Sequence, residues 1–150
     1  MANNEYRKLP TGIQSFNKIR EENYLYVDKT DIIWKLANKG KQYNYLSRPR
    51  RFGKSVLIDT LQCYFEGRKE LFEGLKIMDL EKDWKAYPVI RLDMSRGGAN
   101  AETLRSYLNL RFGFYEEKYA ITPDSTAQLA DRFDAIITTA YKQTGLKVAI

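Results

Sequence analysis

One short segment of the sequence combines the residue types that bind phosphate. It spans residues 48–55 and reads RPRRFGKS, between a short apolar stretch and a region of helical spacing that begins at Lys54. Phosphate-binding P-loops have the pattern G-x-x-x-x-G-K-[ST] between a strand and a helix. The segment matches every fixed position except the first glycine, where Arg48 stands. The sequence therefore predicts a nucleotide-binding loop, and a basic turn without a ligand is the alternative.

The residues of this loop have distinct expected roles. Gly53 lets the backbone approach the phosphates, while successive amides and the helix N-terminus donate hydrogen bonds to the anion. Lys54 can reach the β- and γ-phosphates, and the Ser55 hydroxyl can ligate Mg²⁺. The expected ligands are ATP and Mg²⁺. The predicted nucleotide-binding residues are Arg48, Arg50, Arg51, Phe52, Gly53, Lys54, Ser55 and Val56.

The positive charge of the chain is concentrated around this loop. The 150 residues include 25 basic and 19 acidic side chains, for a net charge of +6. The stretch 35–54 contains no acid and seven cations: Lys35, Lys39, Lys41, Arg48, Arg50, Arg51 and Lys54. Such a block indicates an anionic partner. Besides a nucleotide, that partner could be a nucleic acid. The chain would then be a non-enzymatic binding module whose cations at 35–54 contact the phosphates. A third hypothesis is an ATPase-derived scaffold that binds proteins.

Two features of the composition exclude other chemistry. The sequence contains no histidine, which removes Ser-His-Asp triads, Cys-His dyads and histidine-ligated metals. Its single cysteine, Cys63, cannot form an internal disulfide or a thiolate cluster. Cys63 lies in an apolar run and is predicted to be a small core residue. The polar N-terminus has no signal segment, so a cytoplasmic protein without a membrane partner is expected; it could form homo-oligomers.

Alternating segments predict the fold class. Short runs of aromatic and β-branched residues at 24–27, 43–46 and 89–92 are predicted strands. Helices are predicted over 12–21, from Asp28 to Gly40, from Lys54 to Gly67, after Asn100, and from 123–125 to Gly145. Strands alternating with helices indicate an α/β fold, a largely parallel sheet flanked by helices. We expect residues 1–42 to form an N-terminal helix-strand-helix segment and residues 43–150 a partial P-loop ATPase domain. The two parts are expected to form one compact unit.

Several segments together resemble a known family. They are LPTGIQSF at 9–16, YVDKT at 26–30, SRPRRFGKS at 47–55, YFEG at 64–67, LFEGL at 71–75 and WKAYPVIRLDMS at 84–95. This set is similar to the bacterial predicted AAA-ATPase-like family, whose own loop is rich in arginine and lacks the first glycine. The resemblance implies a P-loop ATPase domain that binds ATP with Mg²⁺. Family members usually continue into a domain that resembles PD-(D/E)XK nucleases.

A P-loop ATPase also needs an acidic motif that holds Mg²⁺ and orients the attacking water. The internal candidate is Asp93, after the apolar run 89–92, although Arg91 is unusual in a strand buried on both faces. The resemblance implies that the acidic motif follows the stretch 147–150, so the chain is expected to be an N-terminal fragment that binds nucleotide without hydrolysing it. Asp93 remains a candidate near Mg²⁺. Asp28 is interpreted as a helix cap, with a role at the nucleotide as the alternative.

Overall fold

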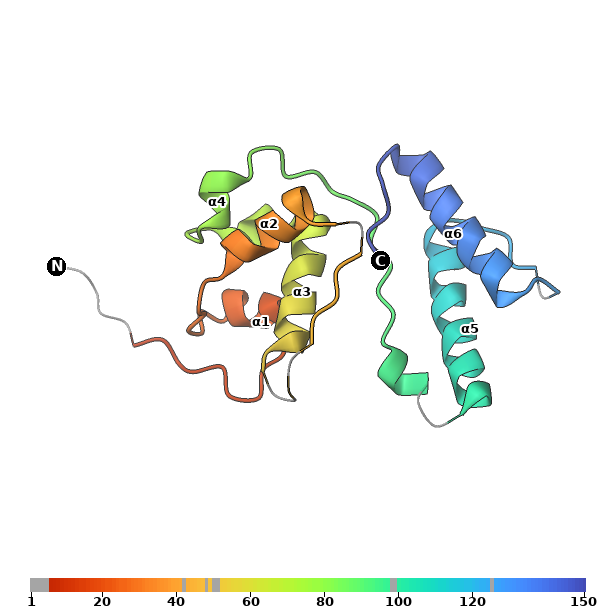
Figure 1. The fold of residues 1–150 in the computed structure, drawn as a ribbon, viewed down its shortest axis with the longest axis horizontal. Helices are drawn as coiled ribbons and strands as arrows, with labels where there is room; N and C mark the ends of the chain where they lie inside the picture. The colour runs from red at the N-terminus through yellow and green to blue at the C-terminus, as the bar shows by residue number, and fades with distance from the viewer. Residues whose placement is uncertain (1–5, 42, 48, 50–51, 98–99, 125) are drawn as a thin grey trace. The chain divides into compact units, whose positions relative to one another are not determined.

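The computed structural model describes residues 6–41, 43–47, 49, 52–97, 100–124 and 126–150 (Figure 1). The chain divides into two compact units, Met1–Ala86 and Tyr87–Ile150. The first unit contains α1 (Phe16–Glu21), α2 (Thr30–Lys39), α3 (Lys54–Phe65), the 3₁₀ turn η1 (Lys69–Phe72) and α4 (Ile77–Leu80). The second contains the 3₁₀ turn η2 (Met94–Gly97), α5 (Ala101–Lys118) and α6 (Leu129–Thr144). Among these described helices, none is long and apolar enough to cross a bilayer.

The predicted α/β fold with a parallel sheet is wrong. The described residues form helices and turns, and none of them lies in a strand of a sheet. The predicted strands 24–27, 43–46 and 89–92 are not helical, but none of them forms a ladder of backbone hydrogen bonds with another strand. One isolated parallel bridge joins Val89 to Ala149. It consists of a bond from the Ile90 amide to the Ala149 carbonyl (2.8 Å) and one from the Ala149 amide to the Pro88 carbonyl (2.9 Å).

Side chains of α5 explain why the segment after Pro88 has no strand on its other edge. The hydroxyl of Tyr115 accepts a hydrogen bond from the Arg91 amide (2.7 Å), and that of Tyr107 accepts one from the Asp93 amide (2.6 Å). Arg111 donates to the carbonyl of Arg91 (3.3 Å). These helix side chains bond backbone groups that a neighbouring strand would pair with in a sheet. The apolar run 89–92 does not reveal this alternative.

Aromatic packing forms the core of the first unit. Phe72 is fully buried, and its ring centroid lies 4.9 Å from that of Phe16 and 5.1 Å from that of Trp84. Tyr64, on α3, packs against the rings of Phe72 and Trp84 and donates a 2.5 Å hydrogen bond to Glu81. Both α1 and α2 contact α3 (Figure 1). The rest of the buried cluster comprises Ile33, Cys63, Leu71, Leu75 and Ile77.

The ends of the helices follow the predictions in part. Gly40 follows α2, Gly145 follows α6, and Asn100 caps α5, as predicted; the structure adds that this cap is a capping box with Thr103. The first helix ends at Glu21, as predicted, but its predicted start at residue 12 is wrong, because α1 begins at Phe16, after a turn at 11–12, and its cap is Ser15. A helix start at 123–125 is also wrong. The carboxylate of Asp124 instead accepts from the Thr126 amide and hydroxyl in a local turn that precedes α6.

Burial disfavours the reactive thiolate form of Cys63. Cys63 belongs to the aromatic core of the first unit, as predicted, and burial raises the pKa of its thiol to about 12. Because the thiolate is the nucleophile, we expect no labelling of the native protein by iodoacetamide at pH 8 over an hour. One equivalent of label should be incorporated in denaturant, measured by intact mass. Rapid labelling of the native protein would show that Cys63 is accessible.

A buried ion pair joins α5 to α6 in the second unit. Glu116 is 3% exposed, and its two carboxylate oxygens accept from Nε (2.7 Å) and Nη2 (2.8 Å) of Arg132. The core around this pair includes the stacked rings of Phe112 and Phe133. These hydrogen bonds from Arg132 lower the pKa of the Glu116 carboxyl. The pair therefore contributes stability only while Glu116 is ionised.

Glu116→Gln is expected to reduce the free energy of unfolding by about 2 kcal/mol at pH 7, because it removes a charge-assisted bidentate contact. The folded-state pKa lies below the unfolded value of about 4.3. The contribution is therefore present above pH ~4.3 and is lost as the pH falls through the lower, folded-state pKa. Denaturant unfolding followed by far-UV circular dichroism at several pH values should show the two proteins converging in acid. A difference that does not change with pH would contradict this account.

Candidate functional site

The candidate site is the N-terminal end of α3. Gly53 directly precedes this helix with φ 72° and ψ 17°, in the left-handed region that favours glycine. A Cβ atom at this position would meet nothing within 4 Å. The requirement for glycine is therefore one of backbone conformation and not of space. The resulting turn directs the chain into the first turn of α3, where Lys54 and Ser55 follow.

The first turn of α3 has the properties of an anion-binding helix end. Gly53, Lys54 and Ser55 are exposed, and the turn contains no acidic residue. The Leu57 amide donates to the Gly53 carbonyl (3.0 Å), which is the first bond of the helical ladder. Amides before that bond point along the helix axis toward the solvent side, where the helix dipole favours negative charge. The structure thus brings the backbone turn, the lysine and the serine together at one helix end.

The second turn of α3 contains contacts that the sequence did not predict. Asp59 accepts a 2.7 Å hydrogen bond from the amide of Phe16, the first residue of α1. Thr60 is fully buried and donates to the Val56 carbonyl (2.7 Å). The sequence signal for Asp59 is its spacing of four residues from Ser55, which places both on one helix face. The partner at Phe16 lies 43 residues away and has no local signature.

The other predicted nucleotide-binding residues flank this helix end or lie outside the described residues. Phe52 is 64% exposed, and Val56, in the first turn of α3, is half-buried. The predicted binding residues Arg48, Arg50 and Arg51 lie outside the residues that the structure describes. The site that can be described therefore consists of Gly53, Lys54 and Ser55, with Phe52 and Val56 on either side.

Asp93 belongs to the second unit, whereas α3 belongs to the first. Its carboxylate accepts from the Ser95 hydroxyl (2.6 Å) and amide (3.2 Å) and lies 3.5 Å from Nε of Arg96. The hydrogen bond from the Ser95 hydroxyl is the main cause that lowers the pKa of Asp93. Within the described part of the chain, no three acidic or cysteine side chains gather into a set that could hold a metal ion. The role of Asp93 near Mg²⁺ remains a prediction.

Asp28 has a structural role in the first unit. One carboxylate oxygen accepts from the Thr30 amide (2.9 Å) and hydroxyl (2.7 Å), and the other accepts from the Lys76 amide (2.8 Å). Thr30 is itself fully buried and accepts from the Ile77 amide (3.1 Å). These bonds tie the start of α2 to the start of α4. The N-cap of α2 is Lys29, which has no side-chain cap, so the interpretation of Asp28 as the cap residue is wrong; Asp28 precedes the cap, and its carboxylate accepts from the first residue of the helix.

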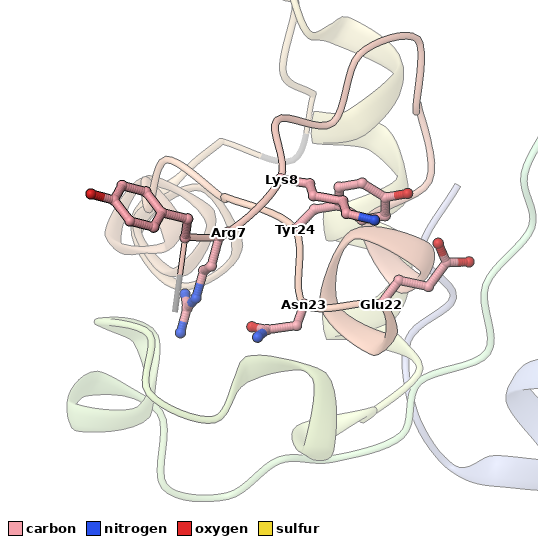
Figure 2. Close-up of a pocket in the computed structure, with 6 residues that line it drawn as sticks. Arg7, Lys8, Glu22, Asn23 and Tyr24 are labelled. Atoms are coloured by element: carbon pink, nitrogen blue, oxygen red, sulfur yellow. The ribbon is translucent and has the colours of Figure 1, made fainter. Parts of the chain in front are cut away.

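A shallow pocket of about 300 Å³ lies elsewhere on the first unit (Figure 2). Arg7 and Asn23 extend toward one side of it, and Lys8 and Glu22 toward the other. The charges are therefore mixed. Tyr6 and Tyr24 also line it, and of the predicted nucleotide-binding residues that the structure describes, 52–56, none does.

The start of α3 is an exposed helix end with the order Gly-Lys-Ser, an arrangement that favours the binding of an anion. Residues 10–150 match the AAA-ATPase-like family, described as Predicted AAA-ATPase, and the chain belongs to this family. It is also 39% identical over 147 residues to a protein of Azotobacter chroococcum mcd 1, described as "Uncharacterized protein in vnfD 5'region". That alignment covers 96% of this chain and 28% of the relative, so the chain spans less than a third of that protein. No solved structure matches the chain.

Proposed function

We propose that this chain binds ATP with Mg²⁺ at the N-terminal end of α3. The observation that carries the proposal is the left-handed turn at Gly53, followed at once by Lys54 and Ser55 in the first helical turn. Membership of a family of predicted AAA-ATPases supports a nucleotide as the anion. A free phosphate would fit the same chemistry, but the two additional phosphates of ATP offer Lys54 more charge to contact.

Each residue has a defined task in this proposal. The turn at Gly53 and the amides at the start of α3 would contact the phosphate oxygens. The ammonium group of Lys54 would lie against the β- and γ-phosphates, and the Ser55 hydroxyl would be a ligand of Mg²⁺. When bound, the metal ion neutralises phosphate charge. The absence of acids from the first turn fits this use, since a carboxylate there would repel the nucleotide.

Isothermal titration calorimetry with ATP tests this proposal. Binding should saturate at one ATP per chain in the presence of Mg²⁺ and weaken when Mg²⁺ is removed with EDTA. Titration with AMP is the matched control, because AMP has the same base and ribose but lacks the β- and γ-phosphates. Equal affinities for ATP and AMP, or no saturable binding of either, would contradict the proposal.

A second candidate, binding of single-stranded nucleic acid, is favoured by a different observation. Tyr43 and Tyr45 are 85% and 93% exposed within the acid-free stretch 35–54. Exposed aromatic rings among cations are the combination that stacks on bases and contacts the backbone of a single strand. Fluorescence anisotropy with a labelled dT20 oligonucleotide discriminates the two functions. Oligonucleotide binding that falls steeply with salt and is insensitive to Lys54→Ala would favour this second candidate.

A further inference from the structure

The start of α3 passes from solvent into the core within one turn. Phe52, Gly53, Lys54 and Ser55 are all exposed, and the first side chain of α3 that packs against the core cluster is that of half-buried Leu57. The nearest buried side chain on the helix is Thr60, and half-buried Asp59 lies beside it. A binding site holds its geometry only when neighbouring contacts fix the groups that form it. The contacts of residues 59 and 60 are therefore the natural support for the helix end.

The amide of Phe16 donates a long-range hydrogen bond to Asp59, in the second turn of α3. This bond joins residues 43 apart in sequence with a donor–acceptor distance of 2.7 Å. Phe16 is fully buried, so without an acceptor its amide would be left unsatisfied away from water. The amide also lies at the start of α1, where the helix has no internal acceptor for it. Removing the acceptor would therefore cost the contact that joins the start of α1 to α3 at Asp59.

We propose that Asp59 is a positioning residue for the anion end of α3, acting through its hydrogen bond to Phe16. The effect on ATP binding rests on the proposed function. The effect of the Phe16–Asp59 hydrogen bond on the start of α3 does not depend on it. The role requires an acceptor oxygen and not a negative charge. Asparagine at position 59 should therefore substitute for aspartate, whereas alanine should not.

Electrostatics alone predicts the opposite result for ATP. Asp59 lies one helical turn from Ser55, so its negative charge opposes the binding of a polyphosphate. If charge were the main effect, both Asp59→Ala and Asp59→Asn would tighten ATP binding. If positioning is the main effect, Asp59→Ala should weaken it at least fivefold, while Asp59→Asn should stay within twofold of the original chain or bind slightly more tightly.

The test combines calorimetry with NMR-detected amide hydrogen exchange. Glu81→Ala is the control, because it also removes one acid and a short hydrogen bond, to Tyr64 near the other end of α3, together with two bonds to the amides of residues 82 and 83. In Asp59→Ala the Phe16 and Leu57 amides should exchange at least fivefold faster, while Asp59→Asn and Glu81→Ala leave Leu57 unchanged. Equal exchange at Leu57 in the two alanine variants, or tighter ATP binding by Asp59→Ala, would overturn the proposal.

The two readouts separate this inference from the proposed function. If the original chain does not bind ATP, the proposed function fails, and the exchange of Leu57 still decides whether Asp59 positions the helix end. If ATP binds and Asp59→Ala leaves both its affinity and the exchange of Leu57 unchanged, the nucleotide site stands and the role of Asp59 falls.

Discussion

Lys54→Ala is expected to weaken the binding of ATP with Mg²⁺ at least tenfold, a loss of about 1.4 kcal/mol or more. Lys54 is the only basic residue among the three that the structure brings together at the start of α3. Its ammonium group supplies a point charge at the phosphates that backbone amides cannot replace. Calorimetric titration of both proteins at the same ionic strength measures the difference.

The control for Lys54→Ala is Lys82→Ala. Lys82 is an exposed lysine in the same unit, and the substitution changes the net charge by the same amount. Lys82→Ala should bind ATP with unchanged affinity, because general attraction of an anion depends little on one distant charge at moderate salt. Matching titration curves for Lys54→Ala and the original chain would show that this helix end does not hold the phosphates.

Phe72→Ala should reduce the free energy of unfolding of the first unit by about 3–5 kcal/mol. Phe72 is fully buried between the rings of Phe16 and Trp84, so truncation removes apolar contact and leaves a cavity. The chain has two tryptophans, Trp34 and Trp84, and both pack on this core. Denaturant unfolding followed by tryptophan fluorescence therefore reports this unit.

The control for Phe72→Ala is Phe52→Ala, which makes the same chemical change at an exposed ring in the same unit. Its effect on the free energy of unfolding should stay within about 0.5 kcal/mol. If the two substitutions reduced the stability equally, the aromatic cluster around Phe72 would not be the centre of this core.

The sequence predicted helices better than strands for a physical reason. The apolar periodicity and the terminal glycine and asparagine signals of α2, α5 and α6 are local, and the structure confirms them. A strand requires a partner that sequence alone does not identify. At Arg91 and Asp93 the partners are tyrosine hydroxyls of α5, so an apolar run that is typical of a strand forms none.

In the candidate site, too, local features could be predicted from the sequence and long-range contacts could not. The Gly-Lys-Ser order at 53–55 is a local pattern, and it places a left-handed turn and a helix start where the structure has them. The contact of Asp59 with Phe16 spans 43 residues and could not be deduced from spacing. Asp93 follows an apolar run that forms no strand of a sheet in the described chain, and its role near Mg²⁺ stays a prediction.

The most direct test of the central claim is an NMR titration of the ¹⁵N-labelled chain with ATP and Mg²⁺. The account predicts that the largest amide shifts fall on Gly53, Lys54, Ser55 and Val56, at the start of α3, and that AMP at the same concentration causes much smaller shifts there. Shifts that are absent from these four amides, or that concentrate instead around the pocket at Arg7 and Tyr24, would contradict it.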